Sequence, residues 1–493
     1  MTDLIFLTAT ELVAAIRTRQ VSAVDVLDAY LKQIAAHNPK VNAVITLDEE
    51  RARQRAVEAD AALARGEIWG PLHGLPITVK DALETAGLRT TSSFKPLAHY
   101  IPKQDATAVA RLRSAGAIVL GKTNLPELAN GPQVNSPLFG TTNNPWDLSR
   151  TPGGSSGGSA AAIAAGFSAL ELGSDIGGSV RLPAHFCGIF SIKPTDYLVS
   201  TVGHIPPPPP TRFRGLLQYL LSVGPLARSI ADLKLALSLI AGPDINAWQI
   251  PPVSLAGEPP RPLREQRFAW SDDFGGFPIS DDTRTALTQL ADNLTRAGCR
   301  VERCNPPGLD FRAAVETNYE IQMSAFMVRG TPLHLPRTAF RWLAQRMPVS
   351  EPVARGGLSG TGATLKQYAA ALARREGYIY SLEQFLANYD AWLCPVASVP
   401  AFRHTSAATI VEQIRATVDL DGQPISYLNA ANMFTSIFNL TGNPAVVVPV
   451  ARSKEGLPIG VQVVGRRWAD MTLLNIAEAL TEVTGPFRPP AGY

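Results

Sequence analysis

Two glycine-rich turns, each of which contains serine, lie close together in the first half of the chain. The first reads GGSSGGS over residues 153–159, and the second reads GSDIGGS over residues 173–179. Because glycine has no Cβ, such turns let backbone amides and a serine hydroxyl come close to a ligand. Flexible linkers are also rich in glycine and serine, but they lack large apolar residues. This segment contains several that require burial, namely Ile163, Phe167, Leu170, Leu172 and Ile176. We therefore expect an active site here rather than a linker.

A serine nucleophile needs a base, and the sequence offers no evident histidine for that role. The seven histidines are scattered, and only His185 lies near the serines along the chain. Its neighbours Ala184 and Phe186 are apolar, so we interpret His185 as a packed core residue. The second turn, which ends at Ser179, also lacks the G-x-S-x-G arrangement of many serine hydrolases. A Ser-His-Asp triad is therefore not indicated.

A lysine can replace histidine as the base if it is neutral. This requires a pKa well below the ordinary value of about 10.4, which burial or a neighbouring positive charge can produce. Lys80 ends the apolar run Leu75–Val79, at the end of an expected buried strand. Taken alone, Lys80 is better explained by a salt bridge with the adjacent Asp81 at the end of the strand.

Other motifs point away from nucleotides, metals and cofactors. Residues 116–123, GAIVLGKT, match the phosphate-loop pattern G-x-x-x-x-G-K-T. However, β-prone residues occupy the loop positions, and Asn124-Leu125-Pro126 follows where a helix would have to begin. The four cysteines fall in no metal-ligand or redox spacing, and neither do the histidines. We expect no metal and no cofactor.

The composition is that of a soluble globular protein. Of the 493 residues, 45% are hydrophobic and 18% charged, far from the signature of disorder. The 45 basic and 42 acidic residues are spread along the chain, so no electrostatic footprint for nucleic acid is present. The N-terminal segment does not have the pattern of a signal peptide or a membrane anchor, and the unpaired cysteines suit a reducing compartment. We expect a cytoplasmic protein.

Periodicity indicates an α/β fold. Capping patterns at Thr8 with Glu11 and at Ser22 with Asp25 each precede an amphipathic helix. Further helices are expected at 51–65, 106–114, 159–165 and 470–483. Short apolar runs between them predict buried strands at 75–79, 117–120, 169–172, 189–192, 444–449 and 459–464. We expect one large mixed, mainly parallel central sheet covered by helices on both faces.

The chain is interpreted as a single domain, residues 1–493, with four regions. These are N-terminal helices (1–70), a catalytic core (71–250), a helical region that forms a substrate pocket (310–390) and C-terminal strands with a helix (430–493). Residues 204–214, HIPPPPPTRFR, predict a stiff polyproline loop, which could act as a lid or bind a proline-recognising partner. The 310–390 region is rich in aromatic residues and methionine, which can form either a core or an apolar pocket.

The chain resembles the amidase signature family over nearly its whole length, least clearly from about 255 to 420. The similarity lies in successive blocks that appear in the family's order. They are GPLHGLPITVKD (70–81), GKTNLPELA (121–129), NSPLFGTTNNPWD (135–147), TPGGSSGGSAAAIAAG (151–166), GSDIGGSVRLPAHFCGIFSIKPT (173–195), GPLARSIADL (224–233), FNLTGNPAVVVPV (438–450) and GLPIGVQVVG (456–465).

The resemblance implies the amidase signature fold and a Ser-Ser-Lys catalytic triad. The nucleophile matches Ser179, the bridging serine, which follows a cis peptide bond in the family, matches Ser155, and the base matches Lys80. The implied oxyanion hole consists of the backbone amides of Ile176, Gly177, Gly178 and Ser179. Asp175 and Arg181 are expected to pair and brace the nucleophile turn, and Ser156 to bond Lys80 or Ser155. Asn130 and Gln133 match positions that line the acyl pocket in family members.

The implied activity is hydrolysis of a carboxamide C–N bond in a small or medium neutral amide, through an acyl-enzyme. Esters and carbamates are further candidate substrates, and a homodimer is compatible with the resemblance. The alternative is a glutamine-hydrolysing amidotransferase subunit that works with partner proteins, but Asn432 stands where that subunit has its glutamine-recognising aspartate. A non-enzymatic scaffold that binds a partner through Pro206–Pro210 is a third hypothesis, which the presence of all three triad residue types disfavours.

Overall fold

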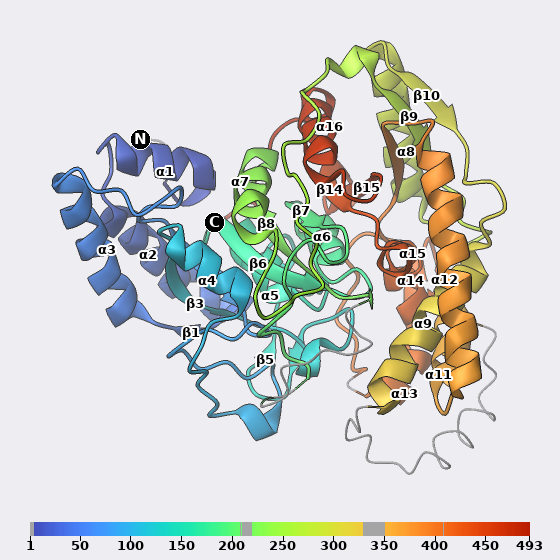
Figure 1. Cartoon of the computed structure of the whole chain (residues 1–493), viewed down its shortest axis with the longest axis horizontal. Helices are drawn as coiled ribbons and strands as arrows, with labels where there is room; N and C mark the ends of the chain where they lie inside the picture. The colour runs from blue at the N-terminus through green and yellow to red at the C-terminus, as the bar shows by residue number, and fades with distance from the viewer. Residues whose placement is uncertain (1–3, 208, 210–218, 329–350, 408) are drawn as a thin grey trace.

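One large mixed sheet runs through the protein (Figure 1). The computed structural model describes residues 4–207, 209, 219–328, 351–407 and 409–493. In this part of the chain, 11 strands form the sheet in the order β1-β3-β2-β6-β8-β7-β14-β15-β11-β9-β10. In chain order these are β1 (Val44–Leu47), β2 (Pro76–Lys80), β3 (Ile118–Thr123), β6 (Leu170–Asp175), β7 (Phe190–Lys193), β8 (Ser222–Ala227), β9 (Arg267–Trp270), β10 (Arg300–Arg303), β11 (Ala391–Pro395), β14 (Ala445–Arg452) and β15 (Pro458–Val464).

The prediction of a mixed sheet is confirmed, but most of the strand pairs are antiparallel and not parallel. Parallel pairing is confined to two groups, β3-β2-β6 and β11-β9-β10. Every other pair in the sheet of described residues is antiparallel. Part of the difference comes from β14 and β15, since the short turn that joins them imposes antiparallel pairing. Another part comes from β8, whose Gly224 and Pro225 conceal a strand in the sequence.

Helices cover both faces of the sheet, as expected. On one side α5 (Gly157–Ala164) and α6 (Arg181–Cys187) pack together, and α6 contacts β14 and β15. A second group, α7 (Ile230–Ile240), α8 (Asp281–Arg296) and α16 (Asp470–Thr484), also packs together and against the sheet.

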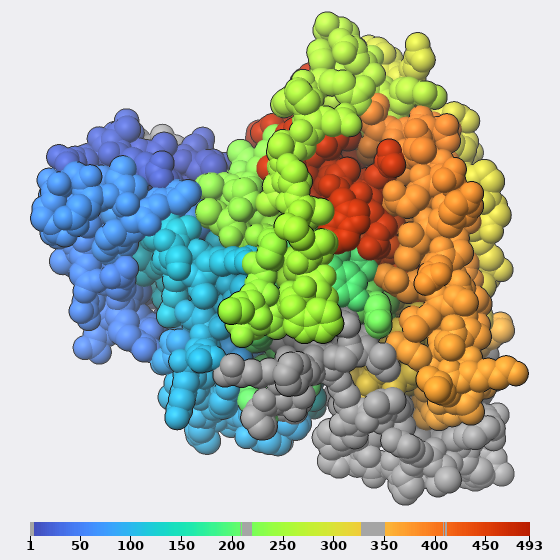
Figure 2. Space-filling view, in the orientation of Figure 1, coloured from blue at the N-terminus to red at the C-terminus, as the bar shows by residue number. Residues whose placement is uncertain are grey.

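The N-terminal helices lie at one end of the molecule (Figures 1 and 2). They are α1 (Ala9–Arg17), α2 (Ala23–Val41), α3 (Glu49–Ala64) and, further along the chain, α4 (Thr107–Ser114). Both predicted capping boxes are present, at Thr8 with Glu11 and at Ser22 with Asp25. Because these side chains satisfy amides that would otherwise lack an acceptor, they fix where α1 and α2 begin.

The opposite end is built by α9 (Phe311–Val328), α11 (Pro352–Gly360) and α12 (Leu365–Leu386), which pack on one another. The described residues of the 310–390 region are therefore mainly helical, while residues 329–350 lie outside the described part of the chain. Phe274 stacks on Trp392 of β11 with ring centroids 5.2 Å apart, and Phe311 of α9 packs against Phe274. This aromatic cluster attaches α9 to the sheet. The predicted polyproline loop is described only at residues 204–207 and 209.

None of the described helices is both long and apolar enough to cross a membrane.

Candidate active site

Lys80 is completely buried at the end of β2 and meets three serine hydroxyls. Its Nζ lies within hydrogen-bond distance of Ser155 Oγ at 2.7 Å, Ser156 Oγ at 2.9 Å and Ser174 Oγ at 3.0 Å. The salt bridge between Lys80 and Asp81 that the sequence left open is absent from the described ion pairs. Asp81 instead accepts hydrogen bonds from the Thr91 amide and hydroxyl, at 3.0 and 2.6 Å. Lys80 is therefore directed into the two glycine-serine turns.

Burial prepares Lys80 to act as a base. Loss of hydration disfavours the ammonium form and lowers its pKa to about 7, even though the carboxylates of Asp175 and Glu171 act in the opposite direction. A lysine with this pKa is substantially neutral near neutral pH and can accept a proton from a hydroxyl group.

Ser155 reaches Lys80 from a tightly packed turn just before α5. The Gly154–Ser155 peptide bond is cis, which confirms the expectation from the family resemblance. A side chain at Gly154 has no room, because a Cβ there would lie 2.5 Å from the Gly131 carbonyl oxygen. The two serine turns are joined by a hydrogen bond from the Ser156 amide to the Ser179 carbonyl at 3.1 Å. The backbone thus fixes the relative position of both serines.

Ser179 lies in the turn that leads from β6 to α6, and Asp175 holds this turn from inside. Its two carboxylate oxygens accept from the Gly178 amide at 2.8 Å and the Val180 amide at 3.0 Å. Arg181 donates to the same two oxygens and pairs with Asp175, as predicted. Burial alone would raise the pKa of Asp175, but the Arg181 guanidinium and the amide donors hold it well below its usual range. The turn therefore has an ionised carboxylate at its centre.

The same contacts reduce the number of backbone amides that can form the predicted oxyanion hole. The Gly178 amide donates to Asp175, so it cannot also stabilise an oxyanion in this geometry. Within the described part of the chain, the amides of Ile176, Gly177 and Ser179 have no acceptor. Gly178 has a different role: its φ of +120° and the position of Thr435 Oγ1, 2.4 Å from where a Cβ would lie, both require glycine.

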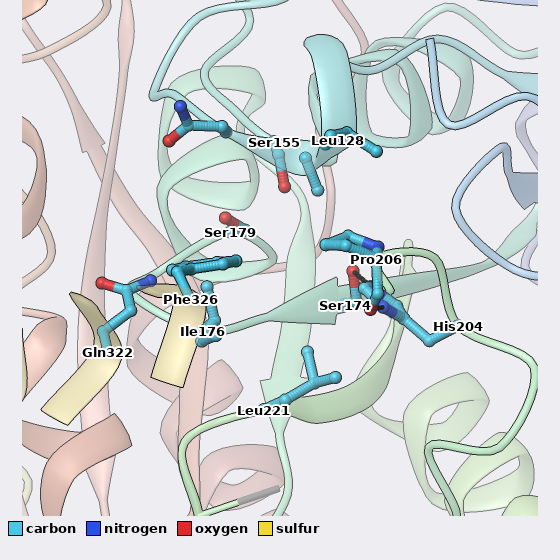
Figure 3. A pocket seen from close by; sticks show the side chains of 12 residues that line it. Leu128, Ser155, Ser174, Ile176, Ser179, His204, Pro206, Leu221, Gln322 and Phe326 are labelled. Carbon is cyan, nitrogen blue, oxygen red and sulfur yellow. Dashed lines mark hydrogen bonds between the residues drawn. The ribbon is translucent and has the colours of Figure 1, made fainter. Parts of the chain in front are cut away.

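A cavity opens in front of the two serines (Figure 3). It holds about 440 Å³ of empty space including its mouth, which suits a small molecule. Gln322 and Phe326 of α9 line the same cavity, and Phe326 lies close to Ser179 in this view. The lining residues are Leu128, Ala129, Asn130, Ser155, Ser174, Ile176, Ser179, His204, Pro206, Leu221, Gln322 and Phe326. Among the described residues, this lining contains no Asp, Glu, Lys or Arg side chain.

The two predicted pocket residues differ in position. Asn130 lines the cavity, whereas Gln133 is not among the lining residues. The Gln133 carboxamide is occupied at both ends by the backbone of Thr405, donating to its carbonyl and accepting from its amide, each at 2.9 Å. Gln133 therefore anchors the loop around Thr405, and a direct substrate contact is not supported.

Sequence reasoning missed two residues of this site, Ser174 and His204. Ser174 Oγ connects these residues to the base: it lies 3.0 Å from Lys80 Nζ and 2.9 Å from His204 Nε2. Ser174 could have been found from the sequence, because it belongs to the second serine turn. His204 could not, because it lies 30 residues further along the chain. His185, in contrast, is the core histidine that was predicted: it is buried and bonds the backbone of Val399 and Gly460. Burial lowers its pKa to about 4, which keeps it neutral.

The phosphate-loop match is a strand, as its β-prone residues indicated. Lys122 is buried on β3 and donates to the Leu83 carbonyl and to Thr85 Oγ1, so it is directed into the protein. No group of three or more potential metal-ligating side chains is found in the described ranges.

A family model described as Amidase matches residues 25–474. The chain belongs to the amidase signature family. Amidase signature enzymes hydrolyse C–N bonds, and this general amidohydrolase chemistry applies to the chain. The site described above lies entirely within the matched region.

Relatives within the family carry different names. A glutamyl-tRNA(Gln) amidotransferase subunit of Symbiobacterium thermophilum is 34% identical over 488 residues, covering 94% of this chain and 94% of the relative. Among solved structures, the corresponding protein from Thermotoga maritima is 29% identical with a TM-score of 0.78, covering 99% of this chain and 98% of that one. A 6-aminohexanoate cyclic dimer hydrolase is 27% identical with a TM-score of 0.80, covering 99% of both. Similarity over the full length therefore extends both to amide hydrolases and to proteins of the amidotransferase.

Proposed function

We propose that this enzyme is a serine amidohydrolase that cleaves small or medium neutral linear amides through an acyl-enzyme on Ser179. One observation carries the proposal: the buried Lys80 has a pKa lowered to about 7 and lies 2.7 Å from the Ser155 hydroxyl. A structural lysine at a strand end would have its charge paired, whereas this one meets hydroxyl groups. A lysine in this environment is suited to receive a proton from a serine.

In the proposed acylation, neutral Lys80 accepts the proton of Ser155, and Ser155 takes the proton of Ser179. The Ser179 oxygen then forms a bond to the amide carbonyl carbon, and the carbonyl oxygen becomes an oxyanion. The amides of Ile176, Gly177 and Ser179 are suited to stabilise that charge, because none of them has another acceptor among the described residues.

Collapse of the tetrahedral intermediate breaks the C–N bond. The proton returns from Lys80 through Ser155 to the leaving nitrogen, so the amine departs neutral. Water then attacks the acyl-enzyme with the same base, and the products are a carboxylic acid and free Ser179. Esters and carbamates fit the same sequence of steps because they have the same reacting carbonyl group.

The lining of the cavity supports a neutral substrate. A charged substrate group usually meets an opposite charge when it is buried, and the described lining residues supply no charged side chain of the Asp, Glu, Lys or Arg type. Apolar contact comes from Leu128, Leu221 and Phe326, while Asn130 and Gln322 provide carboxamide groups. This combination suits an apolar acyl or amine group that carries one further neutral polar function.

An amidotransferase subunit is the second candidate, which the names of the sequence relatives favour. Such a subunit hydrolyses glutamine, whose ammonium group needs a carboxylate partner. The position of the expected aspartate is Asn432, on α14 (Tyr427–Asn432), and its amide donates to the Leu428 carbonyl. A neutral carboxamide at this position disfavours a glutamine substrate.

A turnover panel with the purified chain separates the two candidates. We expect hydrolysis of primary amides or aryl anilides by the chain alone, and little hydrolysis of glutamine. Glutaminase activity that appears only with a partner protein would support the amidotransferase instead. A fluorophosphonate probe should label the wild type and the exposed control Ser238→Ala, but not Ser179→Ala. Labelling that persists in folded Ser179→Ala would rule out this serine as the nucleophile.

A further inference from the structure

His204 is held at the edge of the cavity in one orientation (Figure 3). Its backbone forms a bridge with Leu83, three residues after Lys80, and the next amide, of Ile205, donates to the Ala82 carbonyl at 2.7 Å. The ring is almost fully buried. Its Nδ1 lies 3.2 Å from the Pro206 carbonyl oxygen, and its Nε2 lies 2.9 Å from Ser174 Oγ.

These partners determine where the hydrogen of the neutral ring lies. A carbonyl oxygen can only accept, so Nδ1 is the nitrogen that carries hydrogen and donates to Pro206. In a neutral imidazole the other nitrogen is then an acceptor. Nε2 therefore accepts the hydroxyl hydrogen of Ser174.

The same assignment of hydrogens applies to the serines around Lys80. A hydroxyl group has one hydrogen, and Ser174 donates it to His204 while Ser156 donates its own to the Ser174 carbonyl at 3.3 Å. Both oxygens therefore face Lys80 Nζ as acceptors, at 3.0 and 2.9 Å. Neither serine has a hydrogen left to offer to the amine.

A neutral lysine amine has two hydrogens and one lone pair. Ser156 Oγ accepts one hydrogen, and Ser174 accepts the other through its Oγ at 3.0 Å and, more distantly, its carbonyl oxygen at 3.5 Å. The lone pair is then left for the shortest contact, Ser155 Oγ at 2.7 Å. If His204 did not accept from Ser174, that hydroxyl could turn its hydrogen toward Lys80. It would then compete with Ser155 for the only basic site.

We infer that His204 is a positioning residue, which acts through the Ser174 hydroxyl to direct the lone pair of neutral Lys80 toward Ser155. This inference rests on the proposed function, in which Lys80 is the base. The titratable groups that face Lys80 are Glu171 and Asp175 from β6 and, through Ser174, His204 itself. His204 does not need to contact the substrate or transfer a proton for this role.

Two substitutions of His204 distinguish the effect of its hydrogen-bond acceptor from the effect of its size. His204→Leu removes the acceptor, and His204→Gln supplies a carboxamide oxygen that can accept from Ser174. We expect His204→Leu to lower kcat for an anilide by about 10- to 100-fold, within the usual contribution of proton-transfer catalysis. His204→Gln should recover most of the loss. The pH dependence of kcat/KM gives a second measurement. The pH at which kcat/KM rises, which reports deprotonation of Lys80, should change for His204→Leu and stay near the wild-type value for His204→Gln. The exposed His99→Leu is the control and should match the wild type.

A double-mutant cycle with Ser174→Ala gives the decisive comparison. Without the Ser174 hydroxyl no competing hydrogen exists, so adding His204→Leu to Ser174→Ala should reduce kcat by less than about twofold further. Equal losses in both backgrounds, or no recovery with His204→Gln, would overturn the inference. Thermal unfolding of each variant identifies loss of fold as a separate cause. If Lys80→Ala leaves anilide turnover intact, the proposed function fails; if Lys80→Ala is inactive and the cycle is additive, only the role of His204 fails.

Discussion

Asp175 and Arg181 form a fully buried ion pair that spans the turn carrying Ser179. Arg181 Nε donates to Asp175 Oδ2 at 3.1 Å and Nη2 to Oδ1 at 2.9 Å, while both side chains are inaccessible to solvent. The amides of Gly178 and Val180, on either side of Ser179, donate to the same carboxylate. The position of Ser179 and the Asp175–Arg181 ion pair are therefore coupled in one hydrogen-bonded network.

Replacement of Arg181 should test this coupling. Arg181→Met leaves the Asp175 carboxylate buried without its guanidinium, and breaking such a pair costs about 3–5 kcal/mol. We expect the free energy of unfolding in urea to fall by this amount and activity to fall with it. Arg53→Met, which removes an exposed pair with Asp28, is the matched control and should unfold like the wild type. A stable Arg181→Met with wild-type kcat would contradict the bracing role.

The pH dependence of turnover should report Lys80. Its pKa is lowered to about 7 by burial, and the reaction needs the neutral amine. Activity is therefore lost as the pH falls below about 7, because protonation removes the lone pair, and it levels off above. We expect kcat/KM for an amide to decrease about tenfold per unit well below the pKa. A flat profile between about pH 5 and 9 would show that Lys80 is not the titrating base.

Amides should depend on Lys80 more strongly than esters do. Expulsion of an amine requires a proton on nitrogen, which Lys80 returns through Ser155 in the proposed mechanism, whereas an alkoxide or phenoxide leaves more easily. We expect Lys80→Ala to reduce kcat for an anilide by at least about tenfold more than kcat for the matched ester. The measurement is a pair of substrates with the same acyl group. Equal reductions would argue against the proton relay.

Gly178 should tolerate substitution less than its neighbour. A Cβ at Gly178 would lie 2.4 Å from Thr435 Oγ1 with φ at +120°, whereas a Cβ at Gly177 would meet only Tyr319 Oη at 3.7 Å and Ser436 Oγ at 3.9 Å. Gly178→Ala should destabilise the protein by about 1–3 kcal/mol and slow labelling of Ser179 by a fluorophosphonate. Gly177→Ala keeps its amide and should unfold within about 0.5 kcal/mol of the wild type. Similar unfolding curves for both variants would refute the argument from backbone geometry.

The local features of the site were accessible from the sequence because they depend on neighbouring residues. Three features depend only on residues close in the sequence. They are the glycines of the serine turns, the position of Lys80 at the end of an apolar run, and the capping boxes. In contrast, β8 was concealed by Gly224, where a Cβ would lie 2.0 Å from the Ile192 carbonyl oxygen, so the glycine serves the approach of β7. Gly224, which is unfavourable for a strand in isolation, is therefore required for β8 to pair with β7.

Contacts between distant segments could not be predicted from one sequence. Gln133 was expected in the pocket, but it pairs with Thr405, 272 residues further along the chain. His204 was overlooked beside the prolines, since backbone contacts of its segment with Ala82 and Leu83 bring it near Lys80. In each case the decisive partner is set by the tertiary fold.

In the proposed mechanism the groups that move protons come from residues 80–179, whereas Gln322 and Phe326, which line the same cavity, come from α9, more than a hundred residues later. This separation has an evolutionary consequence. Substitutions of Gln322 and Phe326 can therefore change which compound is accepted, while the residues proposed to break its bond stay the same.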